Sequence, residues 1–286
     1  MEQSNVVCFH NAYINADEKE LDRLWKEVAP QRLIKFFPAK YADDGTNRFL
    51  KHLTTKKLCL SSPVVFNDPF DSVINFDYRT RADQISKELL VNLVGERIAQ
   101  EIMGMNGAQE KIEKAIDSFH STMGHIDKQT EQSIYTTCFS EKDNLYSLRM
   151  WGHYANSHTG VCAEYTFYDV NQSSPFGCIP IKYTDDYEYL INPKNKAEDV
   201  FNFLKLYTKA AEWQYEKEWR VSQKRENYDG LRFEVDFVQP CKIYLGCKAD
   251  ERLKKDIMQL CENQEIEVYQ MKMRPGSFFL DVESVN

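Results

Sequence analysis

The stretch WQYEKEWRV, residues 213–221, alternates between apolar and polar side chains with a period of two. Successive side chains of a strand point to opposite faces, so one face would carry Gln214, Glu216, Glu218 and Arg220. The other face would be aromatic and aliphatic, which predicts a half-buried strand. Two interpretations of the polar face stay open: the two acids pair with lysines of neighbouring strands, or they form the polar wall of a site.

The whole chain has the composition of a globular protein, because 42% of its 286 residues are hydrophobic and 13% are aromatic. A net charge of −8 disfavours general nucleic-acid binding, which needs clustered Lys and Arg. No run of about 18 apolar residues occurs, so we expect no membrane partner. The eight cysteines form no C-x-x-C pair, and the first residues do not resemble a secretory signal. These features predict a reduced, cytoplasmic location.

Hydrophobic periodicity predicts strands and helices that interleave without a regular βαβ rhythm. The remaining predicted strands cover residues 32–37, 57–62, 133–139, 160–167, 231–237, 241–245 and 266–273. The predicted helices cover residues 15–29, 47–56, 145–154, 196–213 and 250–264. This order favours an α+β fold with a mixed or antiparallel β-sheet core and surrounding helices. We expect one domain over residues 1–286, with an inserted helical hairpin near residues 82–125.

A first polar block follows the predicted strand at 57–62 and reads LSSPVVFNDPFD over residues 60–71. Ser61, Ser62, Asn67 and Asp68 are residue types that can bind a ribose or a phosphate. The alternative is ordinary turn chemistry, since Asn, Asp and Pro form turns and caps in many loops.

A second block, MWGHYANSHTG at residues 150–160, holds Trp151, His153, Tyr154 and His158. Aromatic rings beside histidines can stack on a base or on a nicotinamide ring. The alternative is the end of a helix whose aromatic residues belong to the core. The spacing of the two histidines does not suit two metal ligands on one helical face, so we expect no metal site. The chain also lacks the glycine-rich nucleotide loops and the H-E-x-x-H motif.

Five blocks together resemble a bacterial family known as domain of unknown function 2971. They run from Leu33 to Val221 and read LIKFF, LCLSSPVVFNDPFD, CFS, LRMWGHYANSHTGVCAEY and WQYEKEWRV. Members of that family often occur in phage-defence settings, so the resemblance implies an antiviral defence or toxin role. It implies no particular activity.

The order of the polar residues is also similar to that of arginine-type ADP-ribosyltransferases. Those enzymes carry a basic residue on a first strand, hydroxyls on a second and Glu-x-Glu on a later one. Lys35, Ser61 with Ser62, and Glu216 with Glu218 stand in these places, although that family has Arg or His where this chain has Lys35. The resemblance implies NAD as substrate. Glu218 would bind a ribose hydroxyl and stabilise an oxocarbenium-like charge, and Glu216 would orient or deprotonate the acceptor.

The sequence therefore predicts an enzyme that consumes NAD, either transferring ADP-ribose to a protein or nucleic-acid acceptor or releasing nicotinamide. Its catalytic residues would be Glu218 and Glu216, and its ligand-binding residues would be Lys35, Ser61, Ser62, Asn67, Asp68, Trp151, His153, Tyr154, His158 and Arg220. The alternative is a non-catalytic nucleotide- or partner-binding module of a defence system. A third hypothesis, which the acidic composition disfavours, is a metal-dependent nuclease that uses Asp68, Asp71, His153 and Glu218.

Overall fold

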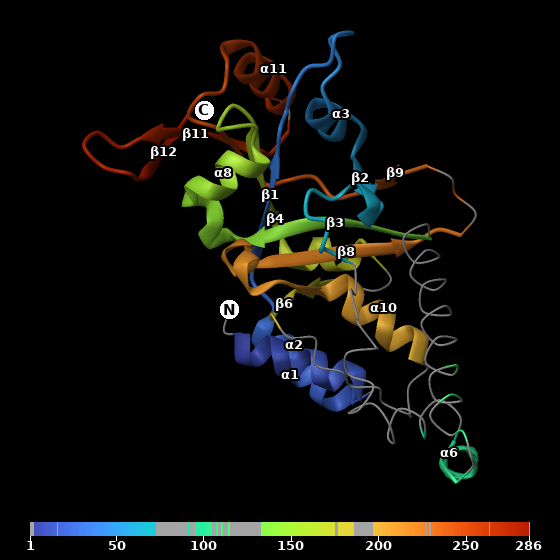
Figure 1. The fold of residues 1–286 in the computed structure, drawn as a ribbon. Coiled ribbons are helices and arrows are strands. Elements are labelled where there is room, and N and C mark those ends of the chain that lie inside the picture. The colour runs from blue at the N-terminus through green and yellow to red at the C-terminus, as the bar shows by residue number, and fades with distance from the viewer. Residues whose placement is uncertain are drawn as a thin grey trace.

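Figure 1 shows the fold of the chain in a computed structural model. The structure describes residues 3–15, 17–72, 95–104, 133–174, 177–185, 197–226, 228, 230–262 and 264–285, together with the single residues 91, 107, 110 and 114. Most of the predicted helical hairpin at 82–125 lies outside these residues, and only α6 (Glu96–Met103) is described there as a helix. No helix within the described ranges has the length and apolar character needed to cross a membrane.

Within the described residues, ten strands form one sheet in the order β12-β11-β10-β4-β1-β3-β2-β9, with β8 on β3 and β5 on β8. The pairings are antiparallel except that of β10 with β11. A second, parallel pair joins β6 to β7. The strands are β1 (Arg32–Phe37), β2 (Lys57–Ser61), β3 (Ile134–Glu141), β4 (Val161–Thr166), β5 (Cys178–Pro180), β6 (Lys182–Tyr183), β7 (Thr208–Lys209), β8 (Glu218–Lys224), β9 (Arg232–Asp236), β10 (Lys242–Leu245), β11 (Glu267–Met273) and β12 (Leu280–Ser284).

Helices surround this sheet, which confirms the predicted α+β class. The α-helices, besides α6, are α1 (Gln3–Ile14), α2 (Glu18–Val28), α3 (Arg48–Thr55), α8 (Leu148–Tyr154), α9 (Phe167–Gln172), α10 (Ala197–Tyr207) and α11 (Glu251–Cys261). The short 3-10 helices are η1 (Pro63–Val65), η2 (Lys142–Tyr146) and η3 (Ala211–Glu216). Local chemistry sets several starts: Asp17 caps α2 by accepting from the Glu20 N–H, and Asn47 caps α3 by accepting from the N–H groups of Phe49 and Leu50.

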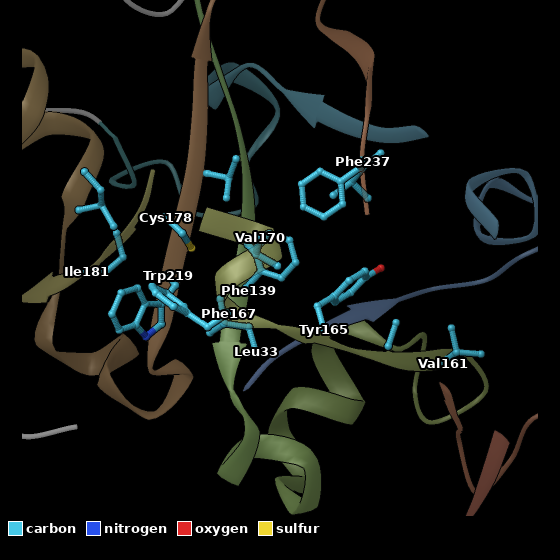
Figure 2. Close-up of a cluster of buried hydrophobic side chains, with 14 of the residues drawn as sticks. Leu33, Phe139, Val161, Tyr165, Phe167, Val170, Cys178, Ile181, Trp219 and Phe237 are labelled. Atoms are coloured by element: carbon cyan, nitrogen blue, oxygen red, sulfur yellow. The ribbon is translucent and has the colours of Figure 1, made fainter. Parts of the chain in front are cut away.

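Alternate residues of the sheet enter two hydrophobic clusters on opposite faces. Leu33 of β1 belongs to a large cluster with residues of α1, α2, α3, α9, α10 and α11, part of which Figure 2 shows. Ile34, the next residue, belongs to a smaller cluster that α8 covers through Met150 and Trp151. The helices on both faces explain why the sheet interior is apolar on both sides.

The stretch at 213–221 differs from the predicted strand. Its first part is the 3-10 helix η3, Lys217 has a left-handed backbone (φ 44°), and the strand β8 begins only at Glu218. The first five residues of β8 are all buried, so both faces of this part of the strand are covered, and β3 and β5 pair with its two edges. The predicted helix at 196–213 likewise ends early, at Tyr207, and the chain continues as β7.

One edge of β3 is shared by two strands that do not pair with each other. β8 follows the whole of β3 along its other edge, from Ile134 to Ser140. On the shared edge β1 pairs with the C-terminal end of β3, through Ile34 and Ser140, and β2 pairs near the N-terminal end, through Ser61 and Thr136. The sheet is therefore open at Cys138, between these two contacts.

Candidate functional site

A cavity of about 240 Å³ lies at this opening in the sheet. Its walls come from β1, β2, the loop after β2, β3, α8, β7, η3, β8 and β9. The lining residues are Ile34, Lys35, Phe36, Cys59, Ser61, Val65, Phe66, Asn67, Asp71, Thr136, Thr137, Cys138, Phe139, Ser140, Met150, Tyr154, Lys209, Glu216, Glu218 and Arg232.

A buried ammonium group joins three carboxylates at one end of the cavity. Lys209 Nζ lies 2.6 Å from Glu216 Oε2, 3.0 Å from Glu218 Oε2 and 3.3 Å from Asp71 Oδ2. All four side chains are almost completely buried. Lys209 therefore holds the two glutamates close together despite their like charge.

Arg220 is the second cation of this cluster, and it is fully buried. Its Nε donates to Glu218 Oε1 at 2.6 Å, and its Nη2 donates to Asp71 Oδ2 at 2.7 Å and to Glu218 Oε2 at 3.3 Å. Its Nη1 donates to the hydroxyl of Ser72 and to the carbonyl of Leu206. All five N–H donors of the guanidinium have a partner, so Arg220 orients Glu218 rather than facing the cavity.

The turn before β8 is fixed by a side chain of η2, the short helix that follows β3. The Asn144 amide donates to the carbonyls of Tyr215, at 3.0 Å, and Glu216, at 2.6 Å. The Glu141 N–H donates to the Lys217 carbonyl. These bonds hold Lys217 in its left-handed conformation, and the reversal returns the Glu216 side chain to Lys209.

The pKa values of the two glutamates are shifted in opposite directions. Burial raises the pKa of Glu216 to about 7, and the Glu218 carboxylate acts in the same direction. Burial also acts to raise the pKa of Glu218, but Arg220 and Lys209 outweigh it and hold that pKa well below its usual range. Two adjacent carboxyl groups thus differ in role: Glu218 stays ionised, and Glu216 can exchange a proton near neutral pH.

Tyr154 and Lys35 contribute further polar groups to the cavity. The Tyr154 hydroxyl donates to Glu216 Oε1, and burial next to that carboxyl raises the pKa of Tyr154. Lys35 Nζ donates to the carbonyl of Cys138 at 2.9 Å. On this edge of β3, neither β1 nor β2 pairs with Cys138. Burial lowers the pKa of Lys35.

Of the predicted site residues, six line this cavity: Lys35, Ser61, Asn67, Tyr154, Glu216 and Glu218. Ser62 and Asp68 instead organise the loop after β2, because Ser62 Oγ accepts from the Val64 N–H and Asp68 Oδ1 accepts from the Phe70 N–H. Of the residues named for a nuclease, Asp71 and Glu218 line the cavity, whereas Asp68 and His153 do not. Among the described residues, no group of three or more His, Cys, Asp or Glu side chains is placed to hold a metal ion.

Of the other predicted residues of the second block, Trp151 and His158 lie in or beside the core, and His153 does not. Trp151 is fully buried and donates through Nε1 to the Leu145 carbonyl at 2.6 Å, and His158 stacks on it. His153 is exposed and does not line the cavity. The structure therefore brings Tyr154, but not the other three residues of this block, into the cavity.

Backbone packing accounts for the end of this block. Residues 156–158 all have left-handed backbones, and the His158 carbonyl accepts from the Lys248 N–H at 3.0 Å. A Cβ on Gly246 would lie 2.1 Å from that carbonyl oxygen, and one on Gly160 would lie 2.2 Å from the Phe37 carbonyl oxygen. Both positions require glycine, because the neighbouring atoms are main chain and cannot move aside.

Lys209, Cys138 and Arg232 are among the polar residues of the cavity that sequence reasoning missed. Lys209 follows helix α10, and lysines within largely apolar text (LKLYTKAAEW) are the signal that could have indicated a buried cation. Cys138 lies in the apolar text YTTCFS, which gives no sign that it lines a cavity. Arg232 begins β9, and nothing nearby in the sequence distinguishes it from other surface arginines.

Comparison with known proteins gives one match. No curated protein and no solved structure shows a significant match to the chain. The model of a family described as "Protein of unknown function (DUF2971)" matches residues 150–221. This segment extends from α8 to the first half of β8 and includes Lys209, Glu216, Glu218 and Arg220. The chain is thus similar to this family over the segment that supplies the charged end of the cavity.

Proposed function

We propose that the cavity binds a nucleotide such as NAD and cleaves the bond between its ribose and the nicotinamide. The observation that carries this proposal is the pair Glu216 and Glu218, two carboxyl groups on one ammonium with opposite shifts of pKa. Bond cleavage at a ribose C1′ develops positive charge on the sugar, and a fixed carboxylate stabilises such charge.

Glu218 and Glu216 would have different roles in this reaction. The C1′–N bond breaks, and its electron pair leaves with the nicotinamide nitrogen. Glu218, which Arg220 and Lys209 keep ionised, lies against the positive ribose. Glu216 accepts the proton of the attacking hydroxyl or water as the new C1′–O bond forms, a role that suits a carboxyl group with a pKa of about 7.

The size of the cavity limits how much of the ligand it encloses. Its volume of about 240 Å³ is below the roughly 300–1,000 Å³ of typical ligand sites. It therefore suits one nucleoside end of a dinucleotide, with the remainder at the surface.

The decisive experiment compares nicotinamide release from NAD by the wild type and by Glu218→Gln. We expect the substitution to lower the rate by about 10²–10³-fold, as for loss of one preorganised electrostatic group. Glu212→Gln is the matched control, because Glu212 lies in η3, the short helix just before β8, but is exposed. Thermal unfolding of each variant separates lost chemistry from lost folding. A wild type that never releases nicotinamide, with acceptors supplied, would refute the proposal.

The proton on Glu216 predicts a pH dependence. Below a pH of about 7 the group is protonated and cannot accept a proton, so kcat/KM should fall about tenfold for each further pH unit. Above this pH the rate should reach a plateau. Glu216→Gln should remove this limb of the profile and leave a low, nearly constant rate. A wild-type profile without a transition near neutral pH would contradict the role of Glu216.

A second candidate, a nucleotide-binding module without turnover, is favoured by one observation. Both oxygens of Glu218 already have cationic partners, which satisfies the group structurally. In that case calorimetry would show weaker nucleotide binding by Glu218→Gln, while mass spectrometry would detect no product from the wild type.

A further inference from the structure

The end of the cavity remote from Lys209 carries hydrogen-bond donors of a different kind. Ser61, at the end of β2, is directly opposite Arg232 of β9 in the antiparallel register. Side chains of such a pair stand on one face, with Cβ atoms about 4.5–5.5 Å apart. Asn67 follows in the loop after β2, and all three residues line the cavity. Arg232 and Asn67 are exposed, which places them at its mouth.

These three side chains are not used by the fold. Within the described part of the chain, no ion pair or hydrogen bond engages the Arg232 guanidinium, the Ser61 hydroxyl or the Asn67 amide. Arg220 shows the opposite situation, with every donor occupied. Donors that line a cavity without protein partners are available to a ligand.

Several cations lie near Cys59 at this end of the cavity, although the whole chain carries a net charge of −8. Burial raises the pKa of the Cys59 thiol, and the charges of Arg232, Arg48 and Lys35 act against this rise. Glu234 raises the pKa of Cys59, as burial does, but Lys51 Nζ donates to its two carboxylate oxygens at 2.7 and 2.9 Å. Cations thus predominate around Cys59, which lines the cavity beside Ser61.

We propose that Arg232, Ser61 and Asn67 form a phosphate subsite at the mouth of the cavity. This assignment rests on the proposed function and specifies its ligand: a nucleotide whose ribose reaches Glu218 and whose phosphate lies over the paired strands β2 and β9, beside Ser61 and Arg232. A guanidinium with neutral hydroxyl and amide donors is a common way to bind phosphate oxygens. The carboxylates at the other end repel phosphate, so the two ends of the cavity would orient the ligand.

The test measures binding by calorimetry with the intact protein and three probes: nicotinamide mononucleotide, nicotinamide riboside and inorganic pyrophosphate. We expect the wild type to bind the mononucleotide about 10–100-fold more tightly than the riboside, as for charge-assisted hydrogen bonds. Arg232→Ala should remove most of this preference and weaken pyrophosphate binding. Arg232→Lys should keep part of it, because lysine retains the charge but not the planar fork.

Arg225→Ala is the matched control. It removes the same charge from an exposed arginine that packs on Phe233 of β9 but does not line the cavity. The control should bind all three probes as the wild type does. The proposal is overturned if Arg232→Ala keeps the preference for phosphate, or if no phosphate-bearing probe binds the wild type.

The outcome is separable from that of the proposed function. Pyrophosphate binding that depends on Arg232 without nicotinamide release would support the subsite and refute the reaction. Nicotinamide release by the wild type, together with an unchanged preference for the phosphate-bearing probes in Arg232→Ala, would support the reaction and refute the subsite.

Discussion

Replacing Arg220 with methionine is expected to lower the free energy of unfolding by about 3–5 kcal/mol, the usual effect of removing one partner from a buried ion pair. Methionine fills much of the aliphatic volume but leaves Asp71, Glu216 and Glu218 with Lys209 as the only cation of the buried cluster. The Ser72 hydroxyl and the Leu206 carbonyl also lose their donor. Urea unfolding at neutral pH measures the change.

Two variants and a change of pH distinguish this cause from simple loss of packing. Arg220→Lys, which keeps the charge, should cost less than Arg220→Met. Adding Glu218→Gln to Arg220→Met should recover part of the loss, because the two changes are coupled through one ion pair. Without Arg220 the pKa values of the buried carboxyls rise, so the folded variant binds protons more readily than the unfolded chain. Its deficit should therefore shrink as the pH falls, and an unchanged deficit would argue against an electrostatic origin.

Replacing Trp151 with alanine is expected to cost about 3–5 kcal/mol, the usual range for a buried tryptophan. The ring is fully buried, meets Phe36 edge to face with centroids 5.2 Å apart, and stacks on His158. Its Nε1–H bond to Leu145 also joins α8 to the end of η2, so alanine leaves a buried carbonyl without this donor.

The measurement again is urea unfolding, with nucleotide affinity determined on the same samples. Trp151→Phe retains most of the ring volume and should recover a large part of the stability. Trp219 provides a comparison, since its Nε1 has no hydrogen-bond partner among the described residues, so Trp219→Phe should cost less than Trp151→Phe. A Trp151→Ala protein of normal stability that no longer binds nucleotide would instead show that Trp151 is a ligand residue.

The local elements were predictable because their causes are local. The strand at 32–37 and the helix capped by Asn47 follow from periodicity and from one capping side chain, and the structure confirms both. Helix α1 was not predicted, because its apolar residues do not concentrate on one face of QSNVVCFHNAYI. Strand β12 is short, and its place in the sheet depends on β11. The predicted strand at 213–221 was partly wrong, because alternation cannot reveal the left-handed turn at Lys217.

The candidate site could be predicted only in part for a similar reason. The alternation at 213–221 predicts that Glu216 and Glu218 lie close together as two acids of like charge, and both are buried beside charged groups. The cation between them, Lys209, comes from another element, and its proximity depends on how α10 ends. Arg232 reaches Ser61 only through the pairing of β2 with β9. These contacts join residues of different elements, so no local sequence pattern predicts them.

The opening between β1 and β2 leaves a short part of one edge of β3 unpaired inside the protein. Sheet edges normally lie outside, where their main-chain groups face water or attract other chains. Here the edge at Cys138 faces the cavity, and the ammonium of Lys35 occupies the place of a ladder donor. Part of the cavity floor is therefore main chain. Substitutions at Thr137 or Cys138 would alter its size while leaving the carbonyl that Lys35 binds, so the polar framework can persist while the side chains around it vary.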